Sequence, residues 1–275
     1  MNSGNIELGL RKFDLKKIKH DSVVVIIAKR NSGKSFLVKD IMNSKRDIPV
    51  GKVVSCTDHL ANFYNQFIPP MFINKEYEPE ILDKIFERQD KAIRHNWPNQ
   101  SCFLIFDDTL SDAGAWKNDK RIKRIFYEGR WFKIFFILTM QEPMGIPGNL
   151  RGNIDFTFIL RTPSASHRKK IYENYAGMFP NLETFEKVLD ACTENYSCLV
   201  IDNTTRSNNL NDQVFYYKAE PHPDLRMCSQ EIWEESHAKY DSGNNFTKKN
   251  SQSSSSSRTT YDSKNGRTRY TIIKR

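Results

Sequence analysis

A segment near the N-terminus has the residue types that bind the phosphate groups of a nucleotide. It matches the phosphate-binding loop G-x-x-x-x-G-K-[ST] at every position but the first, and consists of Ala28, Lys29, Arg30, Asn31, Ser32, Gly33, Lys34 and Ser35. In such a loop, backbone N–H groups surround phosphate oxygens at the start of a helix. The motif predicts that Lys34 contacts the β and γ phosphates and that Ser35 binds Mg²⁺.

The first position of this loop departs from the motif, because Ala28 stands where glycine is usual. Alanine requires a backbone φ below zero at that point, or a slightly strained loop. The departure would weaken nucleotide affinity. The alternative interpretation is an ordinary strand, turn and helix that happens to contain Gly-Lys-Ser.

Two adjacent acids end an apolar segment, Cys102–Phe106, further along the chain. In P-loop NTPases the first acid of such a Walker B segment, here Asp107, completes the Mg²⁺ site. Asp108 is placed to orient or deprotonate the attacking water. Aspartate is shorter than the commoner glutamate, so the water would lie nearer or be relayed. A solvated turn after a strand, where acid pairs are common, is the alternative.

Gln141 follows a further apolar segment, residues 133–140. The carboxyl ends of parallel strands converge on the ligand crevice of a sheet. Gln141 is therefore a candidate to contact the γ-phosphate or the water. A turn before Pro143 is the alternative.

Residues 117–133 form a basic stretch with seven cations and two acids. Such a stretch favours a helix that faces DNA or a neighbouring subunit, with one arginine entering the neighbour's ATP site to stabilise transition-state charge. A solvated basic helix face is the alternative. The cations are Lys117, Lys120, Arg121, Lys123, Arg124, Arg130 and Lys133.

The elements that would position these residues alternate between strand and helix. The strands are continuous apolar runs, which is typical of a buried, mostly parallel sheet in an α/β fold. Two late strands, 196–201 and 213–218, are expected to form a hairpin on one edge. The other predicted strands are 22–28, 52–57, 102–106, 133–140 and 154–160, and the predicted helices are 36–43, 81–95, 117–129, 164–176 and 182–191.

The charge of the chain is uneven. The 275 residues carry a net charge of +9, which favours an anionic partner such as nucleic acid or nucleotide. Residues 241–275 hold eight cations, two acids and five consecutive serines, and this composition predicts a disordered basic tail. We therefore expect an N-terminal basic segment over 1–20, a P-loop ATPase domain over 21–240 and the tail over 241–275.

Some classes of protein are not expected. No apolar run approaches the roughly 20 residues of a membrane helix, and the first twenty residues lack the apolar core of a signal peptide. A protein with a membrane-spanning segment, or a secreted one, is therefore not expected. The six histidines are scattered without metal-like spacing and no C-x-x-C occurs, so zinc is not expected either.

Three segments of the chain resemble a known family. VVVIIAKRNSGKS, CFLIFDD and GRWFKIFFILTMQEPMGIPGNLRGNIDFTFILR are similar to the virion DNA-packaging ATPases of nucleocytoplasmic large DNA viruses, of the poxvirus type. This family belongs to the FtsK–HerA superfamily of DNA-pumping P-loop motors. The resemblance covers Val23 to Arg161, with weaker support to about residue 220. It implies a three-layer P-loop NTPase fold of the RecA/ASCE-like kind.

The resemblance also implies residue roles. Lys34 and Ser35 would bind phosphate and Mg²⁺, and Asp107 would complete the metal site. Asp108 becomes the catalytic acid and Gln141 the polar sensor. Arg130 becomes the arginine finger, with Arg124 as the alternative. Arg151 and Asn153 match the family pattern, but chemistry assigns them no role.

The function implied by the family is an ATP-driven motor that translocates double-stranded DNA into a viral capsid. It would work as a homo-oligomeric ring, a hexamer in the family, with capsid or portal components as partners. Its place would be the virion or the cytoplasmic viral factory of the infected cell. Two alternatives stay open: a nucleotide-gated DNA-binding or scaffold subunit without productive turnover, and a small-molecule kinase.

Overall fold

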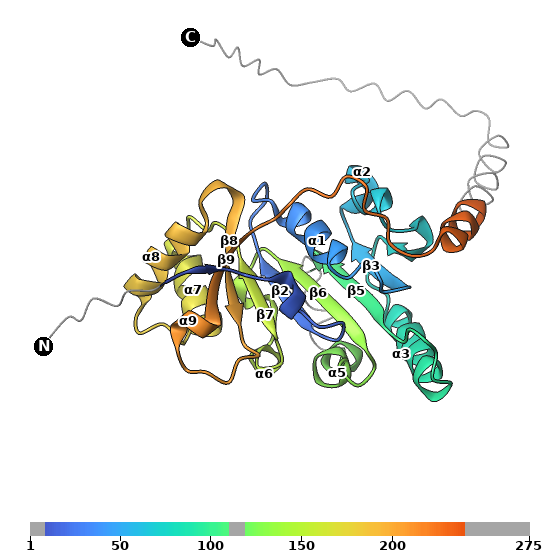
Figure 1. Ribbon diagram of the computed structural model, residues 1–275, viewed down its shortest axis with the longest axis horizontal. Helices are drawn as coiled ribbons and strands as arrows, with labels where there is room; N and C mark the ends of the chain where they lie inside the picture. The colour runs from blue at the N-terminus through green and yellow to red at the C-terminus, as the bar shows by residue number, and fades with distance from the viewer. Residues whose placement is uncertain (1–8, 110–118, 240–275) are drawn as a thin grey trace, which may run out of the picture.

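The strand that leads into the phosphate-binding loop lies at the centre of a nine-stranded sheet (Figure 1). This computed structural model describes residues 9–109 and 119–239. The strand order is β1-β9-β8-β7-β2-β6-β5-β3-β4. In chain order the strands are β1 (Arg11–Lys12), β2 (Val23–Ile27), β3 (Gly51–Ser55), β4 (Ile73–Asn74), β5 (Cys102–Asp107), β6 (Ile134–Met140), β7 (Phe156–Ile159), β8 (Ser197–Asp202) and β9 (Val214–Lys218).

The sheet is mostly parallel, as predicted. β2 pairs in parallel with β6 on one side and β7 on the other, and β5 joins β6 to β3 in the same direction. Only β8, among the described strands, runs antiparallel to its neighbours β7 and β9. The carboxyl ends of β2, β3, β5, β6, β7 and β9 therefore meet at one edge of the sheet, where β8 begins.

Helices connect these strands close to the predicted positions. α1 starts two residues earlier than expected, because Lys34 and Ser35 at the end of the phosphate-binding loop belong to its first turn. The helices are α1 (Lys34–Asn43), α2 (Asp58–Ala61), α3 (Pro79–Arg94), α5 (Lys120–Glu128), α6 (Gly148–Arg151), α7 (Ala165–Tyr175), α8 (Leu182–Cys192) and α9 (Leu210–Gln213). Residues 230–239 are also helical.

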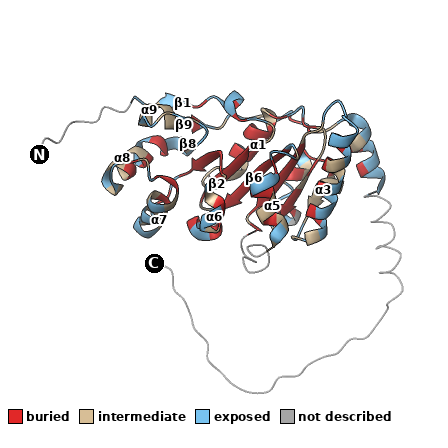
Figure 2. Cartoon of the chain, turned by 90° about the horizontal axis from the view of Figure 1, so that it is seen from below, coloured by how far each residue is buried: buried red, intermediate tan, exposed pale blue. Residues whose placement is uncertain are grey.

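The side chains of β2 alternate between two hydrophobic cores. Val23, Val25 and Ile27 face one core, which α3, α5, α6, α7 and α8 complete. Val24 and Ile26 face the other core, which α1 covers. A strand that is buried on both faces requires an apolar residue at each position, and β2 has one. Helices on both faces make the three-layer α/β architecture that was predicted (Figure 2).

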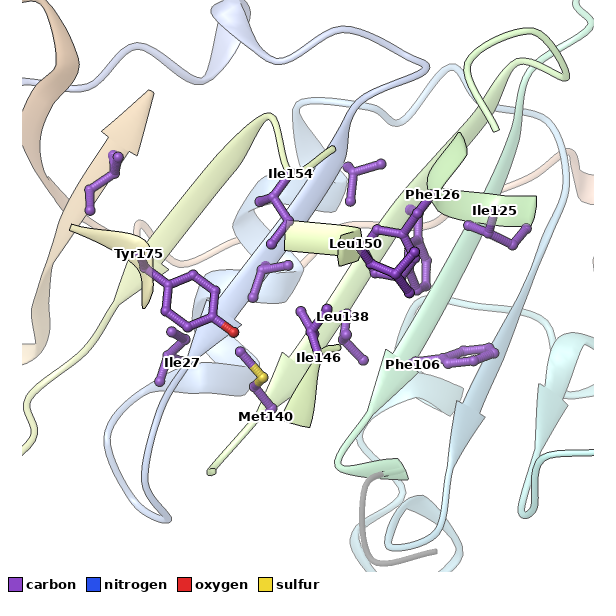
Figure 3. Close-up of a cluster of buried hydrophobic side chains, with 14 of the residues drawn as sticks. Ile27, Phe106, Ile125, Phe126, Leu138, Met140, Ile146, Leu150, Ile154 and Tyr175 are labelled. Carbon is purple, nitrogen blue, oxygen red and sulfur yellow. The ribbon is translucent and has the colours of Figure 1, made fainter. Parts of the chain in front are cut away.

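The core on the α5 side joins the helices to the strands that carry the acids (Figure 3). Phe126 of α5 packs edge-on against Phe136 of β6, with ring centroids 5.5 Å apart. Phe136 makes a similar contact with Phe106 of β5. Such aromatic pairs add roughly 0.5–1.5 kcal/mol to the stability that burial alone gives. They fix β5 and β6 side by side beneath the residues that follow them.

The described part of the N-terminal segment belongs to the same core. β1 pairs with β9 as the edge strand, and Phe13, Leu15 and Ile18 are buried. Residues 9–20 therefore share the sheet and core of the domain that we expected to begin at residue 21. The tail predicted over 241–275, like Lys117, lies outside the described residues.

Candidate active site

The predicted phosphate-binding loop leads from β2 directly into α1. Gly33 adopts a left-handed φ of 94° as the N-cap of α1, a conformation that glycine accepts without strain. Asn31 is also left-handed, at φ 59°, which asparagine tolerates better than most residues. Ala28 is not among the described residues with positive φ, so its side chain causes no left-handed strain. Its N–H donates to the carbonyl of Met140, 2.9 Å away, which anchors the loop to β6.

The lysine of the loop contacts both acids at the end of β5. Nζ of Lys34 lies 3.1 Å from Oδ1 of Asp107 and forms a closer ion pair with Oδ2 of Asp108. Gln141 donates from Nε2 to the same Oδ2 of Asp108, over 3.0 Å. Four predicted site residues, from three separate strand ends, thus meet at one point. Asp108 holds a left-handed φ of 51°, which turns its carboxylate toward the loop.

Thr139, the penultimate residue of β6, links the two acids. Its fully buried hydroxyl donates to Oδ1 of Asp107 over 2.6 Å and accepts the N–H of Asp108 over 3.2 Å. Hydrogen bonds of this kind orient a carboxylate and limit its motion. Thr139 therefore sets the direction in which Asp107 points.

Tyr64 lies beside Asp107 on its other side. Burial raises the pKa of the Tyr64 phenol well above its usual value, and the Asp107 carboxylate raises this pKa further. Asp58 holds the tyrosine in place, because Oδ1 of Asp58 accepts the N–H groups of Phe63 and Tyr64 over 2.9 and 2.8 Å.

A cavity of about 1320 Å³ opens above these residues. Lys34, Asp107, Asp108 and Gln141 line it on the side of β5 and β6, and the loop from Lys29 onward forms its floor. Its volume suits a ligand the size of a nucleoside triphosphate.

The donor set also fits Mg²⁺. Ser35 offers a hydroxyl oxygen and Asp107 a carboxylate oxygen, and both line the cavity. Mg²⁺ prefers oxygen ligands, and it usually takes one or two from the protein while substrate phosphates and water supply the rest. These two residues would hold the ion between the loop and β5.

The sequence is similar to proteins of large DNA viruses. The chain is 40% identical to uncharacterized protein L437 of Acanthamoeba polyphaga mimivirus, over 80% of the chain and 79% of that protein. It is 37% identical to uncharacterized protein 088R of Invertebrate iridescent virus 3, over 72% of the chain and 76% of that protein. No family model matches the chain.

Among solved structures, the chain resembles the genome packaging NTPase B204 of Sulfolobus turreted icosahedral virus 2 in complex with AMPPCP. The TM-score is 0.54 at 16% sequence identity, over 74% of the chain and 100% of B204. At this identity the likeness concerns the fold, which is that of the P-loop NTPases. The chain therefore belongs to one family with these proteins of large DNA viruses. The resemblance drawn from its sequence is thereby confirmed.

The arginine predicted as a finger lies at the opposite edge of the sheet from the phosphate-binding loop. Arg130 precedes β6, and its guanidinium pairs with Oδ1 of Asp155 at 2.7 Å. Asp155 also accepts the N–H of Val23, at the start of β2, over 2.8 Å. The length of β2 therefore separates Arg130 from the phosphate-binding loop of its own chain. Arg130 reaches no nucleotide in its own subunit, so a finger role for it requires a neighbouring subunit.

The alternative arginine, Arg124, is engaged in contacts within its own chain. Arg124 pairs with Glu128 at 2.6 Å, one helical turn away on α5. Its guanidinium also lies over the rings of Phe86 and Phe132, 4.2 and 4.6 Å from their centroids. The side chain of Arg130 is 64% exposed, against 41% for Arg124. Of the two, Arg130 is the better placed to leave its partner.

Arg151 acquires a structural role that its sequence did not reveal. It donates from Nε to the carbonyl of Ile146 over 3.1 Å and hydrogen-bonds through its guanidinium to Asn174 of α7. It thereby ties α7 to the segment that follows Gln141. For Asn153, nothing in the structure indicates a role beyond packing after α6.

Several residues at the site were not predicted. Thr139 is a β-branched residue of the kind common in strands, so the sequence did not indicate that its hydroxyl belongs to the site. Tyr64 and Tyr196 come from irregular segments, and only the fold brings Tyr64 beside Asp107 and Tyr196 to the cavity.

No described helix has the length and apolar character needed to cross a membrane.

Proposed function

We propose that this protein hydrolyses ATP at the Lys34 site and uses the energy to move double-stranded DNA into a viral capsid. The observation that carries the proposal is the meeting of Lys34, Asp107, Asp108 and Gln141 in one cavity. A lysine, a metal-binding acid, a second acid and a polar sensor are the parts that P-loop ATPases use. Family membership and the fold shared with a viral genome packaging NTPase support the DNA step.

The chemistry follows from these positions. N–H groups of the loop and the start of α1 would surround the β-phosphate, and the ammonium of Lys34 would contact the β and γ phosphates. Mg²⁺, when bound by Ser35 and Asp107, would neutralise charge on those phosphates. Gln141 would hold Asp108 in the direction of the γ-phosphate through their 3.0 Å hydrogen bond.

The ion pair between Lys34 and Asp108 suggests how Asp108 becomes free to act as the general base. While the ammonium pairs with Asp108, the carboxylate is engaged and cannot accept a proton from water. A bound triphosphate competes for the same ammonium, since it carries more negative charge than one carboxylate. Lys34 would then turn to the phosphates and leave Asp108 free to orient and deprotonate the water.

We further propose that the ATPase acts as a ring in which Arg130 of one subunit completes the site of the next. Arg130 lies on the surface at the edge opposite its own loop, which suits a contribution to a neighbour. The protein would contact DNA mainly at its phosphates, so binding would be independent of sequence and sensitive to salt. A hexamer, with capsid or portal partners in the virion or viral factory, is the assembly that the family implies.

The test is ATP hydrolysis by the purified protein, with and without duplex DNA. We expect DNA to stimulate hydrolysis, Lys34→Ala to abolish nucleotide binding, and Asp108→Asn to abolish hydrolysis while nucleotide still binds. Lys39→Ala, on the same helix and outside the cavity, is the matched control and should leave hydrolysis unchanged. Unchanged hydrolysis in Lys34→Ala and Asp108→Asn would overturn the assignment. Tight nucleotide binding by the wild type without turnover would favour the scaffold alternative.

A further inference from the structure

The cavity extends beyond the residues that the proposed hydrolysis uses. β2 lies between β6 and β7, and the acids and Gln141 all lie on the β6 side. The γ-phosphate must therefore lie over β5 and β6. A triphosphate that crosses the loop then points its other end over β7, β8 and β9. The lining on that side comes from Phe36, Tyr196, Lys218, Ala219 and Pro221.

Tyr196 has an unusual position on this side. It ends the turn before β8, and both Asn195 and Tyr196 have left-handed backbones, with φ of 51° and 64°. This conformation is unfavourable for a large side chain, and such strain concentrates at ligand sites. The residue is nevertheless 71% exposed, so burial of its ring does not offset the strain. A Cβ placed on Gly33 would lie 3.5 Å from Cδ1 of Tyr196, so the ring lies directly beside the phosphate-binding loop.

The opposite wall of this part of the cavity is held rigidly. Asp40 of α1 accepts the hydroxyl of Tyr217 over 2.7 Å and the N–H of Glu220 over 2.8 Å. Its other oxygen lies 2.7 Å from Nε2 of His222. These three hydrogen bonds fix the segment that contains Ala219 and Pro221 against α1. A wall fixed in advance costs little to order when a ligand binds.

We propose that Tyr196 stacks on the nucleobase of the bound nucleotide and that residues 218–221 form the opposite wall of a base subsite. This inference rests on the proposed ATPase function. An exposed aromatic ring at the end of a phosphate site offers a flat apolar face, and a purine has the complementary flat face. Phe36, which is 61% exposed on the first turn of α1, adds apolar surface to the same part of the cavity. The strain at Tyr196 is then explained, because it holds the ring where the base arrives.

The test compares a ligand that has a base with one that has none. Isothermal titration would measure binding of Mg²⁺–AMPPNP and of Mg²⁺–tripolyphosphate to the wild type, Tyr196→Asn and Tyr196→Phe. Asparagine accepts the left-handed backbone, so Tyr196→Asn removes the ring without changing the turn. We expect Tyr196→Asn to bind AMPPNP roughly 5- to 100-fold more weakly and tripolyphosphate unchanged. Tyr196→Phe should bind both ligands as the wild type does.

The control is Tyr216→Asn, because Tyr216 is an exposed tyrosine of β9 outside the cavity. Wild-type affinity for AMPPNP in Tyr196→Asn would overturn the base subsite. Equal weakening for both ligands would also overturn it, since the tyrosine would then act only on the loop. The proposed function would instead be contradicted if the wild type bound neither ligand. It would also be contradicted if Lys34→Ala bound both ligands as tightly as the wild type does.

Discussion

The hydroxyl of Thr139 donates to Oδ1 of Asp107 over 2.6 Å, from the strand beside the one that carries the aspartate. The pair links β5 to β6 at the point where both strands reach the cavity. The same carboxylate oxygen lies 3.1 Å from Nζ of Lys34. The orientation of the predicted metal-binding acid therefore depends on a residue that does not line the cavity.

We expect Thr139→Val to slow ATP hydrolysis by about 10- to 100-fold, because a buried hydrogen bond to a charged group is worth roughly 1.5–3 kcal/mol. Valine has nearly the same shape but cannot donate to Asp107. Steady-state hydrolysis over a range of Mg²⁺ concentrations would show a raised Mg²⁺ requirement. Thr139→Ser keeps the hydroxyl and should retain most activity. Equal losses in the two variants would indicate a packing effect.

A second prediction concerns the arginine at the far edge of the sheet. Arg130→Ala should leave nucleotide binding intact and reduce hydrolysis by roughly 10³-fold or more, the range of an arginine finger. Mixing Arg130→Ala with Asp108→Asn should restore part of the hydrolysis, because some interfaces then combine an intact arginine with an intact acid. Hydrolysis of the mixtures would be measured against the ratio of the two variants.

The control for this prediction is Asp155→Asn, which removes the ion pair and keeps Arg130. Asparagine keeps an oxygen that can accept the N–H of Val23, so the control should fold. We expect it to keep hydrolysis. Absence of rescue in every mixture would argue that the finger is another arginine or acts within one subunit.

The cysteines should differ sharply in reactivity. Burial raises the pKa of Cys102, Cys192 and Cys228 to about 12 and raises that of Cys198 as well. Only the thiolate reacts, so at pH 8 about one in 10⁴ of a thiol with such a pKa is reactive. Cys56 lines the cavity. Iodoacetamide at pH 8 should therefore label Cys56 alone, and mass spectrometry would locate the label.

Nucleotide should protect this cysteine. Saturating Mg²⁺–AMPPNP would cover the cavity and slow the labelling of Cys56 several-fold, whereas Lys34→Ala should show no protection. Cys56→Ser is the control and should stay unlabelled. Because the folded-state pKa of the four other thiols is raised, raising the pH from 8 to 9 should leave them largely unlabelled. Rapid labelling of Cys192 or Cys198 in the native protein would contradict their burial.

The last prediction concerns residues 241–275. They hold eight cations and only two acids, and this excess of positive charge should strengthen binding to DNA phosphates. A chain that ends at residue 240 should therefore bind duplex DNA more weakly at low salt. Basal ATP hydrolysis should not change. Fluorescence anisotropy with labelled DNA over a salt series would show a shallower salt dependence. A full-length chain with the eight cations changed to serine separates charge from length, and loss of basal hydrolysis in either variant would show that this segment supports the fold.

The parts of the site that lie at strand ends could be predicted from the sequence. Lys34, Asp107, Asp108 and Gln141 each follow an apolar run, and parallel strands bring their carboxyl ends to one edge. Tyr64 and Tyr196 could not be predicted in this way. Tyr64 reaches Asp107 through a turn held by Asp58, and the position of that turn depends on packing far along the chain. The strand β1 could not be predicted either, because two residues are too few to show a strand pattern and its pairing with β9 depends on the fold.

β2 is a stiff mechanical element. Its residues are buried and paired with neighbours on both sides, and Asp155 secures its first N–H while Ala28, just beyond its last residue, bonds to Met140. The loop at one end and the Arg130 edge at the other therefore keep a constant separation while ATP is turned over. In the ring that we propose, a change at the nucleotide would not deform such a sheet. It would instead tilt the whole subunit against its neighbours.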